Sequence, residues 1–183
     1  MKPVVYLHIG QYFASKDPVI IHTVLGSCVS VCFFNPVLRI GGMNHILHSG
    51  EGIGSYDDDN ARFGINAMEL LINEMVSLGA VRSHLIAKVF GGGNIFNFTQ
   101  KYQQGIKNTD FVLRFLETDG LKIAAQDTGG RYSRNLYFYT NTGETLVKRT
   151  NATSNAEKKD KDIIHSTKKV KTIPKTTGDV TLF

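Results

Sequence analysis

Cys28 and His45 are the two side chains of this sequence whose types and spacing suggest covalent chemistry. A cysteine thiolate is a strong nucleophile, and a nearby imidazole can take the thiol proton and later give it to a departing amine. The two residues lie in apolar runs, 27–34 and 38–47, on either side of the turn signal Asn35-Pro36. This pattern predicts a β-hairpin with the cysteine on one strand and the histidine on the other.

The length of the turn predicts how the two strands pair. If residues 35–38 form a four-residue loop, Phe34 faces Arg39 and Cys28 lies directly opposite His45. Directly opposed residues have Cβ atoms about 4.5–5.5 Å apart, which brings a thiol and an imidazole within reach of each other. This geometry allows a Cys–His hydrolase in which Cys28 is the nucleophile and His45 is the acid–base partner.

Gly26 and Ser27 precede the cysteine. A glycine at this position lets the backbone turn sharply and leaves room for a substrate, and the backbone N–H groups near such a turn can stabilise an oxyanion. We expect Gly26 and Ser27 to form the substrate- and oxyanion-binding part of the site.

The same residues also have structural explanations. A cysteine at the start of a strand is usually a small core hydrophobe, and a single histidine is more often a hydrogen-bonded structural residue than a catalyst. Cys32 lies four residues after Cys28 on the same strand face, about 13 Å away at ~3.3 Å per residue, which is too far for a disulfide or a shared metal ion. We expect Cys32 to be a core residue.

Two further motifs and the remaining histidines favour structural roles. The triple glycine at 91–93 lacks the phosphate-loop pattern and predicts a tight turn near the site. The acidic run 57–59 lacks the ligand spacing of a calcium loop and predicts a solvated loop, 48–60, that leads into a helix. We expect no metal, because no ligand spacing relates His8, His22, His84 and His165, and His48 lies past the end of the hairpin in the expected loop.

Composition sets the class of protein. The 183 residues are 42% hydrophobic, enough for one domain with a real core. The net charge of +5 lies mostly in residues 150–183. The sequence has no stripe of arginines with interleaved aromatic residues, which argues against nucleic-acid binding. No segment approaches the ~20 apolar residues that span a bilayer, and two cysteines are too few for a disulfide framework. We expect a cytoplasmic protein without membrane insertion.

Periodicity and turn signals predict a single-domain α/β fold. Helices are expected at about 61–78, where Met68, Leu71, Ile72 and Met75 form one apolar stripe, and at about 108–117. Mixed or antiparallel sheets packed with these two main helices would form a layered α/β sandwich. The strand candidates are 4–9, 19–24, 27–34, 38–47, 85–90, 122–126, 136–140 and 145–148.

The composition divides the chain into three expected segments. Residues 1–149 form the expected catalytic domain. Residues 150–175 are dominated by Asn, Thr, Ser and Lys, which predicts a flexible basic tail because too little apolar surface offsets the entropy of ordering. Residues 176–183 regain apolar character and are expected to dock back on the domain.

Several motifs in order resemble the CheD family of chemoreceptor glutamine deamidases. Thr23-Val-Leu-Gly-Ser-Cys28-Val-Ser-Val-Cys and Gly41-Gly-Met-Asn-His45 carry the resemblance around the hairpin. It continues at 62–75, 87–94, 105–108, 127–131 and 178–183.

This resemblance implies an activity and a site. Family members hydrolyse selected glutamine side chains in the cytoplasmic signalling domains of chemoreceptors to glutamate and release ammonia, without a cofactor. The family's catalytic cysteine and histidine fall on Cys28 and His45, and its threonine falls on Thr23, with His22 at the alternative position one residue earlier. Some members bind a CheC-type phosphatase. The chemistry would pass through a thioester on the cysteine.

Two other functions stay open from the residues alone. Another Cys–His hydrolase, a peptidase or a receptor methylesterase, would pass through the same thioester. A non-catalytic adaptor for a chemotaxis phosphatase would keep the fold and need no reactive thiol.

Overall fold

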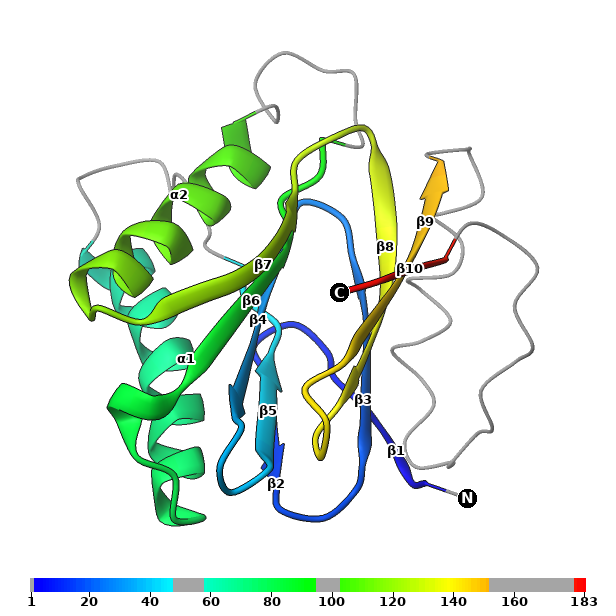
Figure 1. Cartoon of the computed structure of the whole chain (residues 1–183). Coiled ribbons are helices and arrows are strands. Elements are labelled where there is room, and N and C mark those ends of the chain that lie inside the picture. Colours follow the sequence, from blue (N-terminus) through cyan, green and yellow to red (C-terminus); the bar gives the residue numbers. More distant parts are fainter. Residues whose placement is uncertain (1, 48–57, 95–102, 152–179) are drawn as a thin grey trace.

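Two five-stranded sheets and two main helices make up the part of the chain that the computed structural model describes, residues 2–47, 58–94, 103–151 and 180–183 (Figure 1). The outer sheet has the order β1 (Val4–Tyr6), β3 (Ile20–Leu25), β8 (Tyr132–Tyr139), β9 (Thr145–Asn151) and β10 (Val180–Leu182). The central sheet has the order β2 (Tyr12–Ser15), β5 (Ile40–Asn44), β4 (Val29–Asn35), β6 (Ile86–Gly91) and β7 (Lys122–Thr128). The helices are α1 (Asp58–Ser77) and α2 (Gln103–Thr118), with a short 3₁₀ turn, η1 (Arg82–His84).

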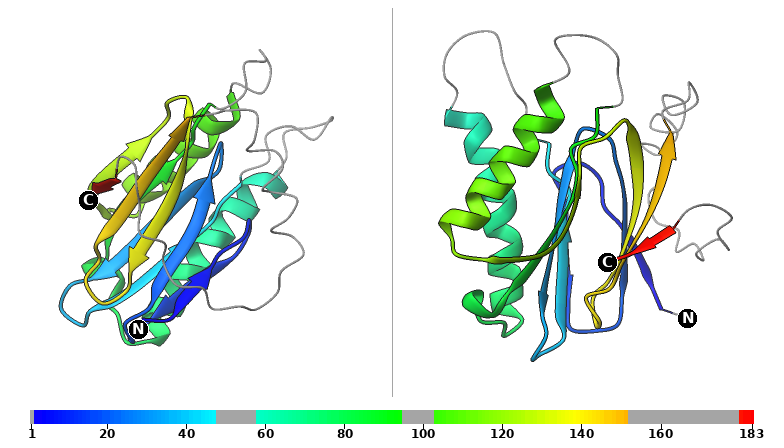
Figure 2. Two further views of the ribbon diagram at one scale, coloured as in Figure 1. Left: turned by 90° about the vertical axis from the view of Figure 1, so that its right-hand side faces the viewer. Right: turned by 45° about the horizontal axis from the view of Figure 1, so that its top comes forward.

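The elements stack in three layers. Both helices cover one face of the central sheet and the outer sheet covers the other, as Figure 2 shows. Each sheet contains one parallel pair, β1 with β3 and β6 with β7, among antiparallel neighbours. The predicted layered α/β sandwich with mixed sheets and two main helices is confirmed.

Strand β4 is buried on both faces and separates two hydrophobic cores. Successive side chains of a strand point to opposite sides. Val29, Val31 and Phe33 therefore pack in the core under the helices, with the predicted α1 stripe. Cys28 and Cys32 pack in the core between the two sheets. The sequence alternation thus directs Cys28 toward the outer sheet.

Two glycines of β5 let the three layers approach closely. A Cβ atom on Gly41 would lie 2.5 Å from the carbonyl oxygen of Thr140 in the outer sheet. A Cβ atom on Gly42 would lie 2.7 Å from the Leu71 side chain on α1. Larger residues at these positions would push the outer sheet and α1 away from β5.

Some element boundaries differ from the predicted ones. The expected strands omitted β2, which has only 4 residues at a sheet edge. Helix α2 begins at Gln103 and not near 108. The prediction missed this first part of the helix because Gly105 is a weak helix former and the apolar stripe starts only at Phe111. Residues 58–60, expected in a loop, belong to α1. The rest of that expected loop, 48–57, lies outside the described residues.

The end of the chain pairs with the outer sheet. Strand β10 runs antiparallel to β9, with Thr181 opposite Val147. The Phe183 ring meets the Phe90 ring at 5.5 Å between centroids. The expected tail at 150–175 lies outside the described residues apart from its first two positions, and the predicted segment boundaries stay predictions. No helix in the described ranges is long and apolar enough to cross a membrane.

His22 is half-buried and His45 is buried, and loss of solvent lowers the pKa of each to about 4. The His22 ring packs between the rings of Tyr6 and Tyr137 on the outer side of the outer sheet, at centroid distances of 5.2 and 4.4 Å. His45 lies between the sheets and is 5% exposed. Both are therefore neutral in the folded protein at pH 7.

We expect the free energy of unfolding to fall as the pH is lowered from 7 toward 4. The unfolded chain takes up a proton at each histidine near pH 6.5, whereas the folded protein does so only near pH 4. Protonation between these values favours unfolding, at a cost on the order of 1–2 kcal/mol per histidine at pH 5. Urea unfolding at pH 7.5 and pH 5 measures the loss.

His22→Phe tests the assignment because phenylalanine keeps the ring between Tyr6 and Tyr137 but does not titrate. This variant should lose less stability between the two pH values than the wild type. His84→Gln, at an exposed position, should behave as the wild type. An undiminished loss in His22→Phe would contradict the account.

Candidate active site

The hairpin forms, but its strands pair two residues away from the predicted register. Asn35 pairs with Ile40, and Phe34 pairs with Gly41 and not with Arg39. The loop therefore contains residues 36–39. The Asn35 carboxamide oxygen accepts the N–H groups of Val37 and Leu38 at 3.1 and 3.0 Å, and Arg39 adopts a left-handed φ of 54°. Asparagine stabilises turns through this kind of side-chain bond, so Asn35 ends the strand where the prediction placed the first loop residue.

This register corrects the predicted opposition of Cys28 and His45. Val29 bridges Ile46, which places Ser30 across from His45 and makes Cys28 its diagonal neighbour. A shift of two residues keeps every side chain on its original face, so both residues still face the outer sheet. Diagonal neighbours lie about 7–8 Å apart, within reach of an imidazole ring.

Thr23 joins the two sheets at this point. Its Oγ1 lies 2.7 Å from Nδ1 of His45 and donates to the Leu7 carbonyl oxygen at 2.9 Å. Thr23 is buried, as are its strand neighbours Ile21 and Leu25 on the same side of β3. His22 points to the opposite side of that strand. Of the two positions that the resemblance left open, the structure thus brings Thr23, and not His22, to His45.

The Thr23 hydroxyl favours one tautomer of His45 when its proton goes to the Leu7 carbonyl. A hydroxyl has one proton, and the Leu7 carbonyl can only accept. If the proton goes to Leu7, the Thr23 oxygen accepts from Nδ1–H of His45, and Nε2 carries the free lone pair. Nε2 is buried and has no hydrogen-bond partner within the described residues. The geometry therefore presents Nε2 as a base.

Burial sets the charge of this histidine. Loss of solvent lowers the pKa of His45, and the nearby His8 acts in the same direction, whereas the Leu7 carbonyl acts in the opposite one. The resulting pKa of about 4 leaves the ring neutral at pH 7. A neutral imidazole can accept a thiol proton, which is the state a general base requires.

Three consecutive carbonyl groups around Cys28 are held from other elements. The Gly93 N–H donates to the Gly26 carbonyl at 2.7 Å, and the Gly92 N–H donates to the Cys28 carbonyl at 2.8 Å. The Ser27 carbonyl accepts Nδ2–H of Asn108 on α2 at 2.7 Å. The segment 26–28 is thus fixed from the end of β6 and from a helix.

These bonds also orient the neighbouring N–H groups. The C=O and N–H of one trans peptide unit point in opposite directions. The N–H groups of Ser27 and Cys28 therefore point away from the donors that hold the Gly26 and Ser27 carbonyls. Oxyanion holes are built from fixed backbone N–H groups, so these two groups are candidates for that role.

Glycines permit this close packing. Gly91 has a φ of 114°, and a Cβ atom there would collide with the Cys28 carbonyl oxygen. A Cβ atom on Gly105 of α2 would lie 2.5 Å from the Gly92 carbonyl oxygen. The triple glycine, for which a tight turn was predicted, has positive φ at Gly91 and Gly92 and contacts the segment that carries Cys28.

Asn108 is the site residue that the sequence patterns did not reveal. It lies on the helix face that packs against the sheet, is fully buried, and is held by Gln104 Nε2 at 3.0 Å from its Oδ1. The signal in the sequence is that Asn108 is polar, whereas other positions on the buried side of this helix, such as Phe111 and Val112, are apolar. Its partner, Ser27, is 81 residues away, so sequence spacing gives no sign of the contact.

Cys32 lies in the core between the sheets. Cys32 is fully buried, and burial raises its pKa, although the Lys88 charge and a Ser30 hydrogen bond act against this. Cys32 is therefore a protonated core residue, as predicted. In the described ranges, no three His, Cys, Asp or Glu side chains form a group that could hold a metal ion.

We expect Asn108→Ala to lower the free energy of unfolding by about 1–3 kcal/mol, because it leaves the Ser27 carbonyl without its donor. Urea denaturation gives this value. Asn135→Ala removes an exposed asparagine bond of 3.5 Å to Thr150 and should change it by less than about 0.5 kcal/mol. Equal losses in the two variants would contradict the role of Asn108.

Comparison with known proteins agrees with the motifs. A family model described as CheD chemotactic sensory transduction matches residues 48–149. A protein of Shewanella oneidensis named probable chemoreceptor glutamine deamidase CheD 1 is 40% identical over 176 residues, covering 95% of this chain and 84% of that protein. The family match begins after Cys28 and His45, whereas the alignment with this relative covers nearly the whole chain.

Other relatives carry the same name. The probable chemoreceptor glutamine deamidase CheD of Bordetella parapertussis is 39% identical over 148 residues, covering 80% of this chain and 70% of that protein. That of Laribacter hongkongensis is 40% identical over 145 residues, covering 76% and 69%. Among solved structures, Bacillus licheniformis hypothetical protein YfiH aligns at a TM-score of 0.44 and 13% identity over 66% of this chain and 51% of that chain, too remote to inform the site. The family match and the relatives show that this chain belongs to the CheD family.

Proposed function

We propose that this protein hydrolyses glutamine side chains of chemoreceptors to glutamate and ammonia, with Cys28 as the nucleophile. The observation that carries the proposal is the 2.7 Å bond between Thr23 and His45, which leaves Nε2 of a neutral imidazole as a base on the face shared with Cys28. The relatives named chemoreceptor glutamine deamidases supply the substrate class.

The first half of the reaction forms a thioester. His45 Nε2 takes the Cys28 thiol proton while the sulfur attacks the carboxamide carbon of glutamine. The amide oxygen gains negative charge, which the N–H groups at Ser27 and Cys28 stabilise. The tetrahedral intermediate collapses, His45 gives its proton to the nitrogen, and ammonia leaves.

The second half returns the enzyme to its starting state. His45 takes a proton from water as the water oxygen attacks the thioester carbon. The carbon–sulfur bond then breaks, the Cys28 sulfur recovers the proton from His45, and glutamate is released. The sum is glutamine plus water giving glutamate plus ammonia, so no cofactor takes part.

Thr23 acts on His45 throughout this sequence. By accepting from Nδ1–H it keeps Nε2 free before the attack, and it stabilises the imidazolium that forms after the proton transfer. Because His45 is neutral in the resting protein, its ring accepts the thiol proton as the substrate amide arrives and does not hold it beforehand. This division resembles the role of the third residue in other hydrolytic triads.

The burial of Cys28 favours a side-chain amide over a peptide bond. Cys28 is 8% exposed, between two sheets. A glutamine side chain is slender and projects beyond its own backbone, so its carboxamide can reach a recessed sulfur. A peptide bond of a folded substrate would have to bring its whole main chain to the same depth. The geometry therefore supports deamidation over proteolysis.

The substrate places the reaction in the cytoplasm, at the cytoplasmic signalling domains of chemoreceptors. A CheC-type phosphatase remains a further proposed partner, on the strength of the family resemblance.

Incubation with purified receptor signalling domains should raise the mass of specific glutamine-containing peptides by about 1 Da and release ammonia. Cys28→Ala should lower this rate by at least roughly 10³-fold, since it removes the nucleophile. Tandem mass spectrometry locates the modified residues.

Cys32→Ala is the matched control, because it removes the other thiol from the same strand. The folded variant should keep the wild-type rate. Full activity in Cys28→Ala would refute the mechanism, and cleaved peptide bonds in place of shifted masses would indicate a peptidase.

A further inference from the structure

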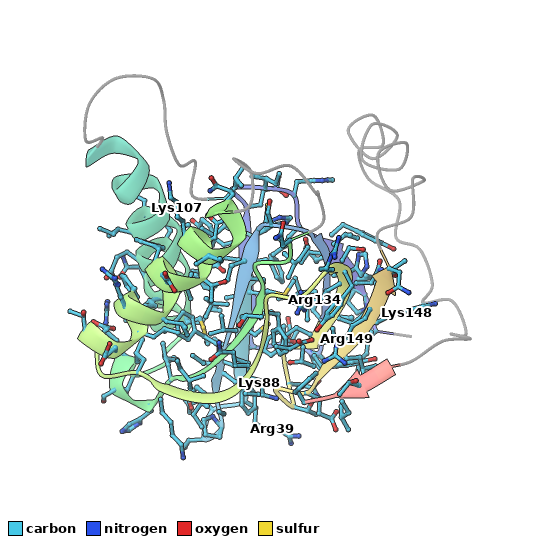
Figure 3. The ribbon with its side chains drawn as sticks, turned by 90° about the horizontal axis from the view of Figure 1, so that it is seen from above. Arg39, Lys88, Lys107, Arg134, Lys148 and Arg149 are labelled. Carbon is cyan, nitrogen blue, oxygen red and sulfur yellow. The ribbon has the colours of Figure 1, made fainter. Side chains whose placement is uncertain are left out.

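Arg134 of β8 is a charged side chain without exposed surface. Its Nη2 donates to Asp127 Oδ1 at 3.0 Å and to the Gly129 carbonyl at 2.8 Å. Its guanidinium lies 4.5 Å from the centroid of the Tyr132 ring. Arg134 thereby connects the outer sheet to Asp127 of β7 in the central sheet, and Figure 3 shows it near Arg149.

Asp127 is almost as deeply buried and holds two arginines. Its second oxygen, Oδ2, lies 3.1 Å from Nη2 of Arg149 and 3.2 Å from Nε. Burial works to raise the pKa of Asp127, but hydrogen bonds and charge from Arg134 and Arg149 outweigh it, and the pKa is lowered. Asp127 is therefore an ionised carboxylate with one arginine on each oxygen.

Stability of the fold does not by itself explain Arg134. Within the described residues, its Nε and Nη1 are buried without hydrogen-bond partners. Burying a guanidinium costs desolvation, and apolar residues of similar volume often hold a core as well as a buried ion pair. The groups that Arg134 does bind therefore indicate a second role for its side chain.

These groups belong to the turn between β7 and β8. Arg134 bonds the carbonyl of Gly129, and the N–H of that residue donates to the Gly91 carbonyl at 2.9 Å. The next residue, Gly130, accepts the Asn94 N–H at 2.7 Å. The turn is thus tied at two points to the end of β6.

The end of β6 in turn holds Cys28. The N–H groups of Gly92 and Gly93 donate to the Cys28 and Gly26 carbonyls. The main chain of Arg134 also pairs with Leu25, the residue before Gly26. The backbone of Arg134 therefore lies next to the nucleophile segment, residues 26–28. Its side chain supports the other side of that segment through the turn between β7 and β8.

We propose that Arg134, held by Asp127, is a positioning residue that fixes the segment 26–28 and with it the Cys28 sulfur and the oxyanion N–H groups. This inference rests on the proposed function. A displacement of about 1 Å far from the chemistry can cost roughly 10²-fold in rate, so loss of this support should lower turnover more than substrate binding.

The test compares Arg134→Met, Arg134→Lys and Asp127→Asn in the full-length protein, below the melting temperature of each. Arg134→Met and Asp127→Asn should lower kcat by roughly 10-fold to 10²-fold, with KM within about 3-fold of wild type. Arg134→Lys keeps the charge and should recover part of kcat. Hydrogen exchange at the Gly92 and Gly93 amides should be faster in Arg134→Met.

Arg82→Met is the matched control. Arg82 makes bonds of 2.7–2.9 Å to Glu69 and Asp119, between the helices and away from the nucleophile segment. Its loss should lower the melting temperature but leave kcat and the exchange of the two glycine amides at wild-type values.

Wild-type kcat and wild-type exchange in folded Arg134→Met would overturn the positioning role, as would equal effects of Arg82→Met. If Arg134→Met does not fold, the double variant Asp127→Leu/Arg134→Leu takes its place, because it leaves no lone charge between these two positions. The same loss of kcat and the same faster exchange are expected for it. A wild-type protein without deamidase activity refutes the proposed function instead, and the exchange measurement still decides whether Arg134 holds the segment.

Discussion

The bond between the Thr23 hydroxyl and His45 Nδ1 depends on how the two sheets pack. Thr23 belongs to the outer sheet and His45 follows β5 of the central sheet, so the 2.7 Å contact exists only while the sheets stay in register. Gly41 permits that approach because any side chain there would collide with Thr140. Sheet packing therefore determines which ring nitrogen of His45 the Thr23 hydroxyl contacts, and the proposed role of His45 as a base depends on that contact.

The cysteine is positioned differently from its base. His45 is fixed by a side-chain bond between sheets, whereas the segment around Cys28 is fixed by its own carbonyl groups, each bonded from β6 or α2. Such bonds constrain peptide planes and do not involve the Cys28 side chain. The glycines at 91–93 allow the approach, and the buried Asp127–Arg134 pair supports the turn beside them. A rigid backbone with a reactive side chain is what preorganised catalysis requires.

The sequence predicted the layers of the fold better than the contacts between its elements. Apolar alternation located most strands, and the stripe containing Met68 and Ile72 located α1. The hairpin register was wrong because the Asn35 side chain and the left-handed Arg39 set the turn, and turn signals alone do not show which residue pairs last. Asn108 binds Ser27 across 81 residues of sequence, so no local pattern could assign its partner.

The proposed mechanism requires that Thr23 holds His45 with its proton on Nδ1 and its lone pair on Nε2. Nitrogen-15 NMR of the histidine rings, followed through a pH titration, measures this directly. In the wild type we expect a protonated Nδ1 and a bare Nε2 at pH 7, with a second proton added only near pH 4. In Thr23→Val we expect the balance between the two tautomers to change. A proton on Nε2 at pH 7, or a spectrum that Thr23→Val leaves unchanged, would contradict it.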